Sequence, residues 1–127
     1  MSNSEITYDI IGAAMEVHRE IGSGYRESPY ENALRNELRL RGRKVEQQRS
    51  WPIRYKETVV GECFTDLIVD ERVVIEAKAE DKIVEAHVAQ LLNYLRLTGI
   101  SLGLVINFKP LSLEYRRVVL NAKHGEF

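Results

Sequence analysis

The segment from Ser101 to Asn107 constrains the fold most, because it contains a nearly unbroken apolar run, LGLVI. A strand with so few polar positions has no face that suits water, and it is typical of a strand buried on both faces of a sheet. The chain has 127 residues, 44% of them hydrophobic, which is enough for one domain with a real core. We therefore expect one domain over residues 1–127, of the α/β (α+β) class, with a central mixed sheet flanked by helices.

Periodic patterns elsewhere predict the other elements. Apolar residues at helical spacing predict helices over residues 5–21, 29–41 and 82–98. Before the second helix, Ser28 is the expected N-cap, Pro29 the first helical residue and Glu31 the partner in a capping box. Runs rich in β-branched and aromatic residues predict strands over residues 44–49, 51–55, 59–69, 72–79, 101–107 and 115–120.

Composition excludes several classes of protein. No apolar run approaches the roughly 20 residues that span a membrane, and the first ten residues lack the pattern of a secretory signal. The single cysteine, Cys63, can form neither an intramolecular disulfide nor a four-cysteine zinc site. We expect a cytoplasmic protein that makes no use of a membrane.

Charge is unevenly distributed along the chain although the net charge is only −1. Residues 35–56 contain eight basic and two acidic residues, and residues 57–93 contain three basic and nine acidic residues. A basic stretch beside an acidic one can form a phosphate-holding rim around a carboxylate cluster. Two solvated faces are the alternative, and charge alone favours that alternative.

The stretch from Asp66 to Lys78, DLIVDERVVIEAK, contains the residues best suited to chemistry. Asp66 on one strand and Glu76 on the next can hold a hard cation such as Mg²⁺ through their oxygens. Lys78 can orient a water molecule or stabilise charge that develops on a phosphate. This set suits metal-assisted phosphodiester hydrolysis. An ordinary Glu76–Lys78 pair on the solvent face of a hairpin explains these residues equally well.

The turn between the two strands decides whether the carboxylates meet. Cross-strand partners share a face of the sheet, so Asp66 opposes Glu76 if the loop is the three residues 70–72. A two-residue turn at Asp70 and Glu71 instead puts the two acids on opposite faces. Residue types alone leave both turns open.

Two other groups of polar residues have a functional and a structural interpretation. His87, Gln90 and Tyr94 share one face of the third helix and can contact a phosphate or a water molecule. They can equally be the polar flank of an amphipathic helix. Glu27 precedes the second helix, where capping of that helix competes with a role in a site.

Several blocks of sequence, in order, resemble the GxxExxY protein family. They are GYRESPY at 24–30, ENALRNEL at 31–38, FTDLIVDERVVIEAKA at 64–79, AQLLNYLRLTG at 89–99 and GLVINF at 103–108, so the resemblance covers roughly residues 5–120. That family is assigned to the PD-(D/E)XK nuclease-like superfamily. The resemblance implies a mixed sheet flanked by helices in the order α-β-β-β-α-β, and it favours the turn that brings Asp66 and Glu76 together.

The resemblance also implies a set of catalytic residues, namely Glu27, Asp66, Glu76, Lys78, Gln90 and Tyr94. Asp66 and Glu76 are the implied metal ligands, together with the backbone carbonyl of Ala77 and with help from Glu27. Lys78 is implied to position the attacking water, and Gln90 and Tyr94 to orient the phosphate or the lysine. Ala77 stands where family members often have leucine, and its side chain is expected to point away from the site.

The implied activity is a nuclease that depends on Mg²⁺ or Mn²⁺ and cleaves DNA or RNA, with residues 35–56 holding the nucleic acid backbone. A non-catalytic accessory module in a nucleic-acid or defence assembly is the alternative. It agrees with the small size and the near-zero net charge of the chain. A third expectation is a homodimer that builds its substrate channel across two subunits.

Overall fold

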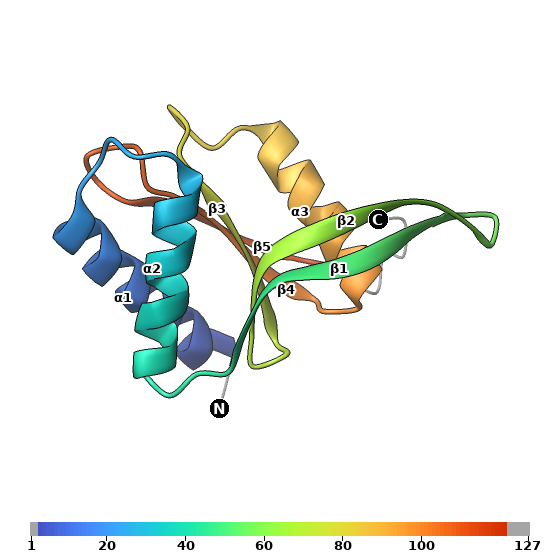
Figure 1. Ribbon diagram of the computed structural model, residues 1–127, viewed down its shortest axis with the longest axis horizontal. Coiled ribbons are helices and arrows are strands. Elements are labelled where there is room, and N and C mark those ends of the chain that lie inside the picture. The colour runs from blue at the N-terminus through green and yellow to red at the C-terminus, as the bar shows by residue number, and fades with distance from the viewer. Residues whose placement is uncertain (1–2, 122–127) are drawn as a thin grey trace.

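A five-stranded sheet between helices forms the fold in the computed structural model, which describes residues 3–121 (Figure 1). Helices α1 (Asn3–Ile21) and α2 (Glu27–Leu40) are followed by strands β1 (Val45–Tyr55), β2 (Thr58–Val69) and β3 (Val73–Lys78), helix α3 (Glu85–Thr98), and strands β4 (Leu102–Asn107) and β5 (Glu114–Val119). The ends of the expected domain, residues 1–2 and 122–127, lie outside the described part. None of these helices is both long enough and apolar enough to cross a membrane.

The sheet is mixed, as expected. Its strand order is β1-β2-β3-β4-β5, and the pairing of β3 with β4 is parallel while the other three pairings are antiparallel. Two parallel neighbours need a long crossover connection, and α3 provides it. The prediction of a central mixed sheet flanked by helices is confirmed.

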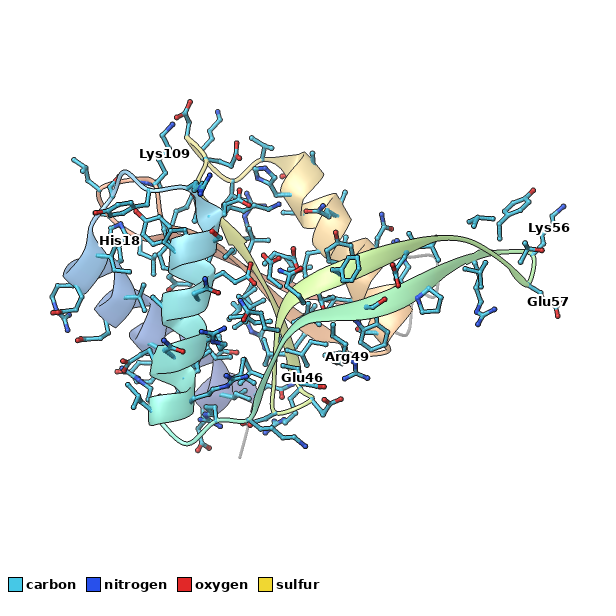
Figure 2. All side chains as sticks on the ribbon, viewed as in Figure 1. His18, Glu46, Arg49, Lys56, Glu57 and Lys109 are labelled. Atoms are coloured by element: carbon cyan, nitrogen blue, oxygen red, sulfur yellow. The ribbon has the colours of Figure 1, made fainter. Side chains whose placement is uncertain are left out.

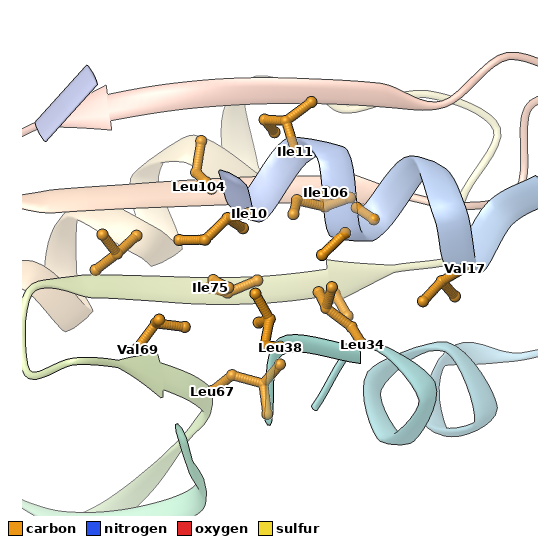
Figure 3. Packing of buried hydrophobic residues seen from close by; sticks show 14 of the residues in the cluster. Ile10, Ile11, Val17, Leu34, Leu38, Leu67, Val69, Ile75, Leu104 and Ile106 are labelled. Atoms are coloured by element: carbon orange, nitrogen blue, oxygen red, sulfur yellow. The ribbon is translucent and has the colours of Figure 1, made fainter. Parts of the chain in front are cut away.

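Alternate residues of the central strands face two separate hydrophobic cores. On one face, Ile75, Leu104 and Ile106 pack with α1 and α2 (Figure 3). On the other face, Val74 and Val105 pack with α3. Every residue of β4 is therefore buried, which is the physical reason for its apolar sequence.

Several element boundaries differ from prediction by one to three residues, and two differences, in β1 and α2, have a clear physical reason. Residues 44–49 and 51–55 do not form two strands but belong to one strand, β1, which runs through Pro52. This strand is at the edge of the sheet, where the missing N–H of a proline breaks no ladder. Helix α2 begins at Glu27 with Arg26 as its N-cap, so Ser28 does not cap it. Pro29 is tolerated in the first turn because N–H groups there have no partner within the helix.

Tyr30 fixes the loop that joins α1 to α2. Its buried ring stacks on Phe108 with 4.8 Å between ring centroids. Its hydroxyl donates to the Gly22 carbonyl at 2.5 Å and accepts from the Tyr25 N–H at 3.2 Å. Gly24, in the same loop, has φ +118°, a conformation that other residues rarely adopt. Gly24 and Tyr30, the first and last residues of the GYRESPY block, thus fix the conformation of the loop that places α2 against the sheet.

Strands β1 and β2 continue past the sheet as a two-stranded arm, which we define as residues 52–62 (Figure 1). Lys56 and Glu57 form its tip, far from the helices (Figure 2). Both have positive φ, 46° and 71°, as a two-residue hairpin turn of mirror-image type requires. Apart from the partly covered Gly61, the residues of the arm are exposed.

Gly103 of β4 allows α3 to approach the sheet closely, because a Cβ added there would lie 2.9 Å from both δ carbons of Leu91. We expect Gly103→Ala to destabilise the protein by about 1–3 kcal/mol. The urea concentration at half-unfolding measures this loss. Gly61→Ala is the matched control, since the nearest atom there is 3.7 Å from the added Cβ. Equal midpoints for Gly103→Ala and the parent would contradict the close approach.

Candidate active site

Strands β2 and β3 form a fork, because they pair only next to their turn. Their ladder runs from Val69↔Val73 to Leu67↔Ile75, which is the register of the three-residue loop 70–72. The sequence left two turns open, and the structure has the three-residue loop. In this register Asp66 of β2 and Glu76 of β3 come next after the last ladder pair and lie opposite each other.

Side chains replace the backbone ladder inside the fork. The backbone N–H of Asp66 donates to Glu76 Oε2 at 3.2 Å, and the N–H of Ala77 donates to Asp66 Oδ2 at 2.9 Å. Each acid therefore satisfies a backbone donor of the opposite strand. The N–H and the carbonyl of one strand residue point to the same edge of that strand, so the Ala77 carbonyl also faces the fork.

Helix α2 contributes Glu31 to this group. The side chain is buried, with only 7% of the residue exposed. Its Oε2 accepts from Gln47 Nε2 at 2.7 Å and from Gln48 Nε2 at 2.9 Å. Gln48 Nε2 also donates to Asp66 Oδ1 at 3.2 Å, so one amide contacts both carboxylates. The prediction that Glu31 completes a capping box was wrong, because this carboxylate is bound by glutamines of β1.

Glu27, the acid that the sequence resemblance selected, lies outside the group. It begins α2 one helical turn before Glu31, and with Arg26, Ser28, Ala79 and Glu80 it lines a hollow of about 540 Å³. Within residues 3–121 no hydrogen bond or ion pair joins Glu27 to Asp66 or Glu76. Helical spacing contained a signal for Glu31, because Leu34 and Leu38 follow it at i+3 and i+7 on the buried face.

Helix α3 faces the fork with Gln90 and Tyr94. Lys78 Nζ donates to Gln90 Oε1 at 3.0 Å, which holds the ammonium over the end of β3. The negative charges of Glu76 and Asp66 act on the Tyr94 hydroxyl: burial raises the pKa of Tyr94 first, and those charges raise it further. His87 has a different role, because its Nδ1 accepts from the Val84 N–H and so caps α3.

Burial and mutual repulsion raise the pKa of both strand acids. Burial raises the pKa of Glu76 to about 9, the charge of Asp66 adds to the effect, and the Asp66 N–H and Lys78 oppose it. The pKa of Asp66 rises to about 6, first because the group is buried and then because Glu31 is close. Hydrogen bonds from Ala77 N–H and Gln48 limit that rise. The fork therefore disfavours the ionised form of both acids in spite of its one lysine.

Three arginines of the basic stretch 35–56 form ion pairs within the protein. Arg41 pairs with Asp9 and Glu37. Arg43 pairs with Asp9 and Asp70 at 2.8 and 2.9 Å. Arg49 pairs with Glu46 and Glu71 at 2.8 and 3.1 Å, at the base of the arm (Figure 2). The ion pairs of these three arginines join α1, α2 and the sheet.

Comparison with known proteins agrees with this geometry. The family model of the PD-(D/E)XK nuclease superfamily matches residues 4–118, and the chain belongs to that superfamily. The model does not test the narrower resemblance to the GxxExxY family, which stays a prediction. No curated protein matches the chain.

Two solved structures share the fold. The alkaline exonuclease LHK-Exo from Laribacter hongkongensis superposes with a TM-score of 0.55 at 15% identity, over 97% of this chain and 73% of the exonuclease. The protein SSO0001 superposes with a TM-score of 0.59 at 21% identity, over 74% of this chain. This chain spans half of the length of SSO0001. At these identities the likeness establishes the fold.

Nucleases of this superfamily generally use divalent metal ions, and the fork suits one. Its donors are carboxylate and carbonyl oxygens, which hard cations prefer. Burial and the closeness of other carboxylates raise the pKa values of Asp66 and Glu76, and a divalent cation would favour the ionised form of both acids. Among residues 3–121 no three Asp, Glu, His or Cys side chains stand close enough to hold a metal ion by themselves. The oxygen donors that face the fork are two strand acids and a backbone carbonyl.

Proposed function

We propose that the protein is a metal-dependent nuclease that hydrolyses phosphodiester bonds of nucleic acid. One observation carries the proposal: Asp66, Glu76 and Lys78 meet at the β2–β3 fork, in a chain of the PD-(D/E)XK nuclease superfamily. The exonuclease LHK-Exo, which shares the fold, supports it. Cleavage of DNA or of RNA agrees equally with this site.

The residues of the fork take separate roles in this proposal. Asp66 and Glu76, with the Ala77 carbonyl, would hold Mg²⁺ or Mn²⁺, which when bound supplies a Lewis acid for the phosphate. Lys78 orients the attacking water and faces the charge that develops on the phosphate. Gln90 fixes the Lys78 ammonium through its 3.0 Å hydrogen bond. Tyr94, beside both acids, can donate to a phosphate oxygen because its raised pKa keeps it protonated.

Glu31 takes the place of Glu27 as the helix acid of the site. Its carboxylate acts on both strand acids, since it raises the pKa of Asp66 and of Glu76. Through the Gln48 amide it is also tied to the position of Asp66. Glu31 thus adds to the negative charge that would retain the cation.

The deciding experiment measures cleavage of labelled single- and double-stranded DNA and RNA with Mg²⁺, with Mn²⁺ and with EDTA. We expect the parent to cleave at least one substrate only when a divalent cation is present. Glu31→Gln should lower that rate by about 10-fold or more, because residues around metal ligands typically contribute 10–100-fold. Glu27→Gln, one turn earlier on the same helix, is the matched control and should cleave like the parent.

Isothermal titration of Mn²⁺ separates this proposal from the non-catalytic module. The nuclease requires binding to the parent and much weaker binding to Asp66→Asn. Absence of both cleavage and metal binding in the parent would contradict the nuclease and favour the accessory module. If Glu27→Gln lost activity while Glu31→Gln kept it, the assignment of the helix acid would be wrong.

A further inference from the structure

Gln48 has an unusual backbone conformation for a residue inside a strand. Its φ is +52°, in the left-handed region, although it lies in the middle of β1. Its neighbours Gln47 and Arg49 pair with Leu67 and Thr65, but Gln48 forms no ladder pair with Asp66, which lies opposite. The other non-glycine residues with positive φ are at the turns 56–57 and 70–71. A left-handed conformation is unfavourable for an L-residue, so contacts around Gln48 must maintain it in β1.

The Gln48 side chain lies between the acid of the helix and an acid of the strand. Nε2 donates to Glu31 Oε2 at 2.9 Å and to Asp66 Oδ1 at 3.2 Å. Among the residues that the structure describes, no other side chain donates to both of these carboxylates. Gln47 contacts Glu31 as well, but its second hydrogen bond goes to Asn32.

The two observations have one physical explanation. Side chains alternate between the faces of a regular strand, so a residue that breaks the ladder can direct its side chain to a place that the alternation does not reach. At Gln48 that place is the gap between Glu31 of α2 and Asp66 of β2. We infer that Gln48 is a positioning residue, which holds Glu31 and Asp66 at a fixed mutual distance and orientation. This inference rests on the proposed function, which assigns Glu31 and Asp66 to the metal site of a nuclease.

Gln48→Gly tests the inference against a purely structural role for the residue. Glycine accepts a φ of +52° without strain, and it removes the amide. If Gln48 served only the strand, this variant would be as stable as the parent or more so and would keep full metal binding. We expect it to keep the parent's urea midpoint or exceed it, while Mn²⁺ affinity and kcat fall about 10-fold or more. KM for the nucleic acid should stay within about 2-fold, since Gln48 acts through the carboxylates.

Gln47→Ala is the matched control, because Gln47 binds Glu31 without touching Asp66. It should change Mn²⁺ affinity much less than Gln48→Gly. Gln48→Asn keeps an amide and a residue type that tolerates left-handed φ, but its side chain is one methylene shorter. We expect it to recover only part of the affinity. Parent-like Mn²⁺ affinity and kcat in Gln48→Gly would overturn the inference.

A second measurement does not depend on catalysis or on metal. Glu31→Gln and Asp66→Asn are made singly and together, and their effects on urea unfolding at one pH form a double-mutant cycle. We expect the coupling between the two changes to differ between the parent and the Gln48→Gly background, because the bridging amide is lost while the direct repulsion of the two carboxylates remains. Coupling of equal size in both backgrounds would overturn the inference. Coupling that depends on Gln48 in a protein that neither cleaves nor binds metal would contradict the proposed function alone.

Discussion

Replacing Lys78 with alanine is expected to slow phosphodiester cleavage at saturating metal by about 100-fold or more. Lys78 is the cation that opposes the charges of Asp66 and Glu76, and Gln90 holds its ammonium in place at 3.0 Å. Without Lys78, no ammonium group orients the attacking water or faces the charge that develops on the phosphate. Single-turnover cleavage with enzyme in excess over labelled substrate measures the chemical step without product release.

Lys82→Ala is the matched control for this prediction. Lys82 is exposed and precedes α3, so its loss removes one positive charge near the site without entering the fork. Lys78→Arg should be impaired too, because the guanidinium is planar and longer and cannot replace a compact ammonium beside Gln90. A Lys78→Ala protein that cleaves as fast as the parent would contradict the mechanism. Its urea midpoint must be compared with that of the parent, so that loss of folding is not counted as loss of chemistry.

Glu76→Gln is expected to stabilise the protein at alkaline pH while it removes the activity. The folded-state pKa of Glu76 is about 9 against an ordinary value of 4.5, so the folded state binds more protons between these two values. The free energy of unfolding of the parent therefore falls as the pH rises from about 4.5 to 9. Glutamine has no such proton and no charge to desolvate. At 1.36 kcal/mol for each pKa unit, the advantage of the variant reaches several kcal/mol near pH 9 and vanishes below about pH 4.

Urea unfolding of the parent and of Glu76→Gln at pH 5, 7 and 9 measures this difference. Asp66, whose pKa rises from 3.8 to about 6, adds its own loss of stability between those two values in the parent. Mg²⁺ or Mn²⁺ should raise the midpoint of the parent, because a cation favours the ionised acids, and should raise that of Glu76→Gln much less. Glu62→Gln replaces an exposed acid of β2 and is the control. Parallel pH profiles for the parent and Glu76→Gln would contradict the raised pKa.

The sheet and its helices followed from local patterns because burial imposes a period on the chain. The apolar run of β4 predicted a strand covered on both faces, and both of its faces are buried. The spacing of Asp66 and Glu76 left two possible turns, of which only one puts both acids on the same face of the sheet. The structure has that turn, which the family resemblance favoured. The pattern failed at Ser50, where it predicted a break between two strands, because Ser50 pairs with Phe64 and β1 is continuous there.

The choice between the two acids of α2 meets a related limit. Glu27 and Glu31 are four residues apart on one helix, so a one-dimensional pattern places both on the same face. Which of the two carboxylates lies near the strand acids depends on the position of α2 along β1 and β2. Arg41, Arg43 and Arg49 show the same limit, since their partners Asp9, Asp70 and Glu71 come from distant parts of the chain.

The amino-acid sequence by itself determined the class of fold, the strand acids with their lysine, and the helix face that meets them. These features depend on periodicity and on short covalent spacings, which a linear pattern records. The tertiary structure alone decided that Glu31 joins Asp66, that the left-handed Gln48 lies between them, and that both strand acids have a raised pKa. Those features depend on burial of the acids and on contacts between α2, β1 and β2, which arise only when the helices pack on the sheet.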